Sequence, residues 1–229
     1  MLSRKRSGTV SIRPDVDRRD DEGLMVGRLT GKVHMLRKVL IGLAVVVALF
    51  VVVVATRPAQ FHIERSIEIA TSPDRPFAQV NDFHAWAAWS PYDKLDPQVT
   101  RTFEGPTSGK GAVYGWKGNE KVGEGRMTIE KSTPSSEIGI KLEFTKPFAA
   151  TNQATFTFAP SASGTKVTWA MDGENNFISK AFALFVDMDK MIGADFEKGL
   201  AAMKTVAESN TATTSTTSAN EAARVNAHD

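Results

Sequence analysis

Apolar and polar residues alternate along seven short segments of the chain, and the connections are rich in Gly, Pro, Ser and Asn. In the segment 137–144, for example, Ile138 and Ile140 fall on one face and Lys141 on the other. A period of two residues predicts an antiparallel sheet with one covered face and one polar face. The predicted strands are 62–70, 97–105, 111–118, 125–131, 137–144, 152–160 and 165–173.

Two short helices are expected between the first and second strands. Ser72-Pro73 is a helix-start signal, and the helix it begins is expected to end near Val80. The second helix brings three rings to one side, because a spacing of three residues keeps side chains on the same helix face. These rings are Phe83, Trp86 and Trp89.

The last element has the periodicity of a long amphipathic helix, from about Ile178 to Val206. Apolar residues recur there at steps of three and four: Phe182, Phe185, Met188, Ile192, Phe196, Leu200 and Met203. This helix is expected to cover the apolar face of the sheet. Gly193 interrupts it, at a cost of about 1 kcal/mol relative to alanine. A kink in the helix or the close approach of a ligand would explain this glycine. We expect the simpler alternative, that the helix tolerates a glycine here without a special role.

Residues 39–56 form an uncharged apolar run, which approaches the length needed to cross a bilayer. In lipid such a segment satisfies its backbone hydrogen bonds only as a helix. Arg37 and Lys38 precede the run and only Arg57 follows it closely. The positive-inside rule then places the N-terminus in the cytoplasm and the rest of the chain outside the cytoplasmic membrane.

A cleaved signal peptide is the alternative to an uncleaved anchor, with Val53-Val54-Ala55 as small residues at the cleavage site. The run is longer than the usual apolar region of a signal peptide, about 7–15 residues, so the anchor is preferred. Met35 offers a second start, which would make residues 1–34 an annotation extension.

Composition divides the chain into four parts: a basic arm at 1–34, the anchor at 35–57, a folded domain at 58–207 and a Ser/Thr-rich tail at 208–229. The arm and the tail are polar, and both are expected to be disordered. Residues 1–38 carry ten basic and five acidic residues, so the remaining chain is net negative although the total is +2. That balance argues against nucleic acid as a partner. The absence of cysteine excludes disulfides and thiolate chemistry.

The segments NDFHAWAAWSPYDKLDP, GKGAVYGWKGNEKVGEGRMTI and FVDMDKMIGADFEKGL, in this order of elements, resemble the SRPBCC superfamily. That superfamily includes START domains, Bet v 1-like proteins and polyketide cyclase/dehydrase proteins, and the resemblance to its membrane-anchored bacterial members covers residues 61–207. It implies an α+β helix-grip fold, in which a curved antiparallel sheet of about seven strands wraps round a long C-terminal helix. It also implies a cavity between the sheet and that helix.

The large apolar side chains of the domain suit the wall of such a cavity, with a few polar tips. Core packing is the simpler interpretation of any single one of them. The candidate ligand-binding residues are Trp86, Trp89, Tyr92, Tyr114, Trp116, Met127, Phe144, Phe156, Trp169, Phe182, Phe185 and Phe196.

No catalytic motif stands out. The four histidines have no metal-site spacing, and the sequence has neither a nucleophile elbow nor a dinucleotide fingerprint. Gly105–Gly111 is one residue short of a phosphate loop and reads as a hairpin turn, while Gly123 and Gly125 suit a turn or a bulge. We therefore expect no metal and no cofactor. His84, in the aromatic segment, is the one weak candidate for a general acid or base.

Three functions remain open. The first is a membrane-tethered domain that binds a hydrophobic small molecule or a lipid in its cavity. The second is a cyclase/dehydratase-like enzyme, which would need a buried ionisable group with a perturbed pKa. The third is an interaction module for an envelope protein, which a solidly packed interior would favour.

Overall fold

The computed structural model describes residues 17–225, with side chains for 34–209. The chain separates into two compact units that meet between Thr56 and Arg57. The first unit contains α1 (Asp17–Ala55), and within it His34–Ala55 is long and apolar enough to cross a membrane. Length and composition fit a membrane span and a signal sequence equally.

Both ends of the described chain are helical. The sequence predicted disorder at 1–34 and 208–229, whereas α1 begins at Asp17 and α4 continues to Val225. Residues 1–16 and 226–229 lie outside the described residues. The limits of the four predicted parts stay predictions.

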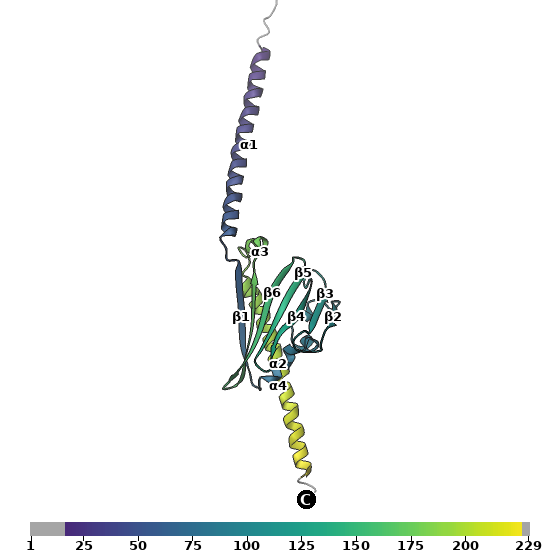
Figure 1. The fold of residues 1–229 in the computed structure, drawn as a ribbon. Helices are drawn as coiled ribbons and strands as arrows, with labels where there is room; N and C mark the ends of the chain where they lie inside the picture. Colours follow the sequence, from purple (N-terminus) through teal and green to yellow (C-terminus); the bar gives the residue numbers. More distant parts are fainter. Residues whose placement is uncertain (1–16, 226–229) are drawn as a thin grey trace, which may run out of the picture. The chain divides into compact units, whose positions relative to one another are not determined.

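The second unit is built on one seven-stranded antiparallel sheet, as predicted (Figure 1). The spatial order is β1-β7-β6-β5-β4-β3-β2, so the first strand pairs with the last, and β1 and β2 form the two edges of the sheet. The strands are β1 (Gln60–Ile69), β2 (Thr100–Glu104), β3 (Val113–Lys117), β4 (Glu124–Thr133), β5 (Glu137–Lys146), β6 (Ala150–Ser161) and β7 (Gly164–Glu174).

The strand register places apolar residues of neighbouring strands on one face. One row across the sheet runs through Ile129, Ile140, Ala154, Met171 and Ile63, all of them buried. The next row runs through Thr128, Lys141, Gln153, Asp172 and His62 on the opposite face. The alternation read from the sequence is therefore the in–out alternation of the sheet.

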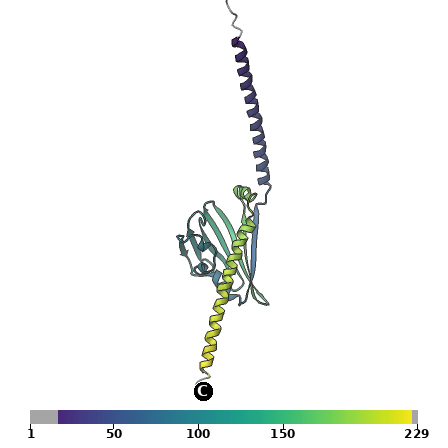
Figure 2. The same cartoon turned by 180° about the vertical axis from the view of Figure 1, so that it is seen from behind.

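Helices and short 3₁₀ turns cover the apolar face. Figure 2 shows α4 crossing the sheet. α4 packs mainly on β1, and α2 packs on β5 and β6. The covering elements are α2 (Asp74–Asn81), η1 (Phe83–Ala88) and α4 (Met188–Val225), whereas η2 (Tyr92–Lys94) and α3 (Phe177–Phe182) contain no buried residue. The helix-grip fold class expected from the sequence is confirmed.

The single helix predicted from Ile178 to Val206 is wrong at its start, because α3 and α4 are separate. Each has its own N-terminal cap: Asn176 accepts a hydrogen bond from Ser179 N at 2.9 Å, and Asp187 accepts one from Lys190 N at 3.0 Å. The break takes Phe182 and Phe185 off the predicted apolar stripe, so they are 51% and 80% exposed. Phe196, Leu200 and Met203 stay on the stripe and are buried.

Gly193 is more than a tolerated glycine. A Cβ on Gly193 would overlap the guanidinium of Arg65, which lies against the helix backbone at this point. Arg65 uses that position to bind both carboxylate oxygens of Asp189 and to donate to Glu197 Oε1 at 3.0 Å. The close partner at Gly193 is thus a side chain of β1.

Candidate functional site

Five of the predicted ligand-binding residues form a filled aromatic cluster between the sheet, η1 and α4. Trp169 stacks on Phe196 with centroids 4.0 Å apart and on Phe156 at 4.9 Å. Trp89 lies edge-on to both Trp169 and Phe156, and Trp86 packs on Trp89 at 4.7 Å. All five are at most 6% exposed. For this set, core packing is the role that the structure shows.

The indole groups of Trp86 and Trp89 also hold η1 against α2. Trp86 Nε1 donates to the carbonyl of Val80 and Trp89 Nε1 to that of Gln79, each at 3.1 Å. Both carbonyls lie in the last turn of α2, where helix carbonyls lack intrahelical partners. The concentration of rings in 81–97 is therefore explained by the joining of two short elements. The Nε1 of Trp169, by contrast, is buried without a hydrogen-bond partner among the described residues.

A second aromatic group remains partly open to solvent. We call Tyr114, Trp116, Leu142 and Phe144 the aromatic row. Its members lie on β3 and β5, and each is only partly buried. Tyr114 stacks on Trp116 at 6.1 Å, and Trp116 meets Phe144 edge-on at 5.5 Å.

Gly125 makes this arrangement possible. Its position on β4 lies directly across from Trp116 on β3, and a Cβ there would come within 2.6 Å of the indole ring. The indole therefore extends across β4 toward Phe144 on β5. The sequence predicted a turn or a bulge at Gly123 and Gly125, and the strand register shifts between Glu124 and Gly125, as at a bulge. Met127, the next candidate along β4, is buried between Tyr114 and Leu142 in the register.

Polar groups lie at one end of the row. Asp93 pairs with Arg101 at 2.7 Å and accepts a long hydrogen bond from the Tyr114 hydroxyl at 3.5 Å. Burial raises the pKa of Tyr114, and the nearby Asp93 carboxylate raises it further. Tyr92, in η2, lies apart from the row near Asp195 of α4; desolvation of its hydroxyl, with a smaller contribution from Asp195, raises its pKa well above its ordinary value although the residue as a whole is 38% exposed. Both phenols are therefore neutral near pH 7.

His84 lies at a separate small pocket of about 200 Å³ beside β2 and β3. Its Nδ1 is 2.8 Å from Asp82 Oδ1, and its ring stacks on Phe103 with centroids 4.0 Å apart. Phe83, Glu104, Thr107 and Val113 also line this pocket. The imidazole is thus oriented by a carboxylate, but its side chain is 50% exposed rather than enclosed.

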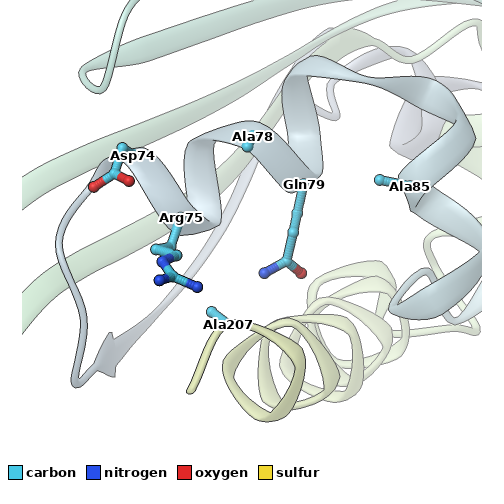
Figure 3. Close-up of a pocket in the computed structure, with 6 residues that line it drawn as sticks. All are labelled: Asp74, Arg75, Ala78, Gln79, Ala85 and Ala207. Carbon is cyan, nitrogen blue, oxygen red and sulfur yellow. The ribbon is translucent and has the colours of Figure 1, made fainter. Parts of the chain in front are cut away.

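A second pocket, of about 260 Å³, lies between α2, η1 and α4 (Figure 3). Arg75 and Gln79 of α2 extend toward Ala207 of α4 in this view. Gln79 is 8% exposed, and its Oε1 accepts no hydrogen bond within the described part of the chain. No motif in the sequence indicated this pocket, because its lining is a set of separate small and polar side chains.

The remaining candidates lie elsewhere. Phe182 and Phe185 belong to the exposed segment between β7 and α4. Among the described residues, neither ring pairs with a ring of the cluster or of the aromatic row. Across the described residues, no three His, Cys, Asp or Glu side chains are grouped to hold a metal ion. Whether any of the twelve candidates binds a ligand stays a prediction.

Comparison with known proteins places the domain in a family. No curated protein matches the chain. Among solved structures, the di-domain ARO/CYC StfQ from the steffimycin biosynthetic pathway is 12% identical with a TM-score of 0.51, covering 67% of this chain and 52% of that one. This likeness shows a shared fold.

Two further solved structures are similar. Mll3558 from Rhizobium loti is 22% identical with a TM-score of 0.44, covering 65% of this chain and 96% of its own. CV1439 from Chromobacterium violaceum is 14% identical with a TM-score of 0.47, and the match covers 66% of this chain and 99% of CV1439. The family model described as polyketide cyclase / dehydrase and lipid transport matches residues 60–208, which confirms the SRPBCC resemblance. The chain therefore belongs to this family.

Proposed function

We propose that the domain binds a hydrophobic small molecule or a lipid along the aromatic row, without a cofactor. The carrying observation is that Tyr114, Trp116 and Leu142 stay partly exposed although they pack against the buried core, and that Phe144, which meets Trp116 edge-on, is also only partly buried. An apolar ligand lying on the row would cover the part of these side chains that is still exposed, and burying that apolar surface favours binding. Asp93, Arg101 and the Tyr114 hydroxyl form a polar group at one end of the row, which would lie next to a polar end group of the ligand.

We further propose that α1 tethers this domain to the cytoplasmic membrane, with the N-terminus in the cytoplasm and the domain outside. The support is the apolar stretch His34–Ala55 with Arg37 and Lys38 near its start. Tethering would keep the domain close to the bilayer, the natural source of an apolar ligand. The intact mass of the chain purified from membranes tests this, since signal cleavage near Ala55 would remove α1.

A charge placed in the row tests the binding proposal. Leu142→Arg should weaken binding of an apolar fluorescent probe, N-phenyl-1-naphthylamine, by at least about tenfold, because a ligand would then have to desolvate a guanidinium. Leu95→Arg is the matched control, since Leu95 is 44% exposed and lies outside the row. Equal probe binding by the two variants, with both folded by circular dichroism, would contradict the proposal.

A cyclase/dehydratase-like activity is the second candidate, and the Asp82–His84 pair at a pocket is the observation that favours it. An oriented imidazole is a suitable general acid or base for aldol condensation or dehydration. His84→Asn and Asp82→Asn should then both slow turnover of a poly-β-ketone thioester while leaving probe binding to the row unchanged. Absence of turnover in the unmodified chain would remove this candidate.

The packed cluster around Trp89 and Trp169 is the feature that favours the third possibility, an interaction module. The open aromatic row weighs against it, because a pure interaction module has no need of half-exposed rings within its sheet. A chain that takes up no apolar probe would shift the assignment to this module.

A further inference from the structure

Exposed large apolar side chains gather in two connections of the domain, between β5 and β6 and between β7 and α4. Single exposed apolar residues are ordinary on a protein surface, whereas a group of them marks an interaction site. We call this group the apolar end patch. Its members are Phe148, Phe177, Ile178, Phe182 and Phe185, which are 62%, 50%, 58%, 51% and 80% exposed.

The sheet register brings both connections to the same end of the domain. β7 ends at Glu174, which pairs with Gln60 at the start of β1, and α3 begins three residues later at Phe177. The β5–β6 turn that carries Phe148 lies at this end too, because Asn152 on β6 pairs with Gly173 on β7. Figure 1 shows α3 at the end of the sheet from which β1 starts.

The opposite end of the sheet has a different character. The β6–β7 turn there reads Ser161-Ala162-Ser163, and the β4–β5 turn reads Thr133-Pro134-Ser135-Ser136. A ten-residue strand such as β1 separates the two ends by about 33 Å. These two turns are thus polar, whereas the β5–β6 and β7–α4 connections at the other end carry the exposed apolar side chains, beside the polar β3–β4 turn at 118–123.

The apolar end is also the one joined to the candidate membrane span. Only five residue steps separate Ala55, the last residue of that span, from Gln60, the first residue of β1. Fully extended, they reach at most about 18 Å. Covalent geometry alone therefore keeps the start of β1, and the connections beside it, near the surface of any bilayer that holds the span.

The residue types suit a bilayer interface. Phenylalanine and isoleucine side chains of this kind enter the boundary between headgroups and acyl chains to a depth of about 5–10 Å. Lys180 lies on α3 between Ile178 and Phe182, and its long stem allows the ammonium group to reach lipid phosphates while the rings insert. Lys146, before the Phe148 turn, is paired with Glu124 at 3.0 Å.

We infer that the apolar end patch inserts into the interfacial layer of the bilayer that anchors the chain. This inference rests on the proposed tethering by α1. It also deepens the proposed function, because Phe144 of the aromatic row pairs with Ala150, only two residues beyond Phe148. A hydrophobic molecule leaving the bilayer would then meet the row at the end that the patch holds against the lipid.

The absence of cysteine permits a clean labelling experiment on the full chain in phosphatidylcholine/phosphatidylglycerol vesicles. Three separate variants each carry one NBD fluorophore. Ala44→Cys places it in the span, Ala162→Cys in the polar β6–β7 turn, and Ala183→Cys beside the patch. Quenching by doxyl groups at shallow or deep positions of the lipid chains then reports the depth of each label. We expect deep quenching at 44, shallow quenching at 183 and none at 162.

Each other result has a definite meaning. Quenching at 44 with none at 183 would overturn the inference while leaving the tether intact. A blue-shifted label at 183 without lipid quenching would also overturn it, since protein would then cover the patch. No quenching at 44 would refute the tethering proposal itself. As a further test, Phe182→Glu with Phe185→Glu should reduce quenching at 183 to the level at 162 without changing that at 44.

Discussion

At the residue scale, the two tryptophans of the WxxW segment act through their nitrogen atoms as well as their rings. Each indole donates to a carbonyl near the end of α2, so η1 is held in place by directional bonds rather than by apolar contact alone. Trp169 is the natural comparison, because it is equally buried and its Nε1 has no partner among the described residues.

Replacing Trp89 by Phe should therefore destabilise the domain more than replacing Trp169 by Phe. Both changes remove the same atoms from the core, but only Trp89→Phe leaves a buried carbonyl, that of Gln79, without its donor. The difference in free energy of unfolding should be about 1–3 kcal/mol, measured by urea unfolding in mild detergent. Equal losses would show that the Trp89 hydrogen bond contributes nothing.

His62 predicts a pH dependence of stability. Its hydrogen bond to Asp172 at 2.7 Å raises its pKa above the ordinary value of 6.5, with Glu64 adding a smaller effect. The group therefore stabilises the fold fully below pH 6.5, and this contribution is lost as pH rises through the higher folded-state pKa.

The effect is modest because the side chain is 54% exposed and solvent screens the pair. The midpoint of urea unfolding should decline from pH 6 to pH 8 in the unmodified chain, and this decline should be smaller in Asp172→Asn. An identical pH profile for the two proteins would show that the pair does not contribute.

At the element scale, α4 meets β1 through Arg65 and Gly193. In an isolated helix, alanine is more favourable than glycine by about 1 kcal/mol. Here the added methyl group would displace the guanidinium from Asp189 and Glu197. The glycine is thus explained by the contact between elements, which no periodicity within the helix can show.

A double-mutant cycle follows from this contact. Gly193→Ala should increase the free energy of unfolding less in the unmodified chain than in the Arg65→Ala background, where no guanidinium has to move and up to about 1 kcal/mol of helix propensity can be gained. An equal effect in the two backgrounds, measured by urea unfolding, would contradict the assigned role of Arg65.

Element positions were largely predictable and their junctions were not. Alternation located all seven strands: β1 and β4 to β7 each bury one face, whereas β2 and β3 keep the alternation although none of their residues is fully buried. The spacing of apolar residues, however, continues without a break from α3 into α4. It gives no sign that Asp187 caps a new helix by accepting a hydrogen bond from Lys190 N. Phe182 and Phe185 fit that period by spacing alone, and their exposure depends on the break.

The same limit applies to the candidate site. The sequence identified the aromatic residues as a set, but it could not separate the packed cluster of Trp86, Trp89 and Trp169 from the open row of Tyr114, Trp116 and Phe144. That separation depends on cross-strand register and on the close passage of Trp116 over Gly125. The Gln79 pocket was missed because its lining residues are brought together only by the tertiary fold.

At the scale of the whole molecule, one chain combines a candidate membrane span, an apolar end and an open aromatic row. The order of these features is set by chain connectivity: the span leads into β1, and β1 starts at the end that carries α3. This arrangement favours exchange of an apolar molecule between bilayer and domain over chemistry on a soluble substrate.

The central claim is that the domain holds a hydrophobic molecule, and native mass spectrometry of the full chain purified from membranes tests it most directly. We predict a stoichiometric apolar adduct, released by organic solvent, that is retained in Leu95→Arg and lost in Leu142→Arg. A clean mass of the unliganded chain that stays unchanged when lipids and apolar probes are offered would contradict the claim.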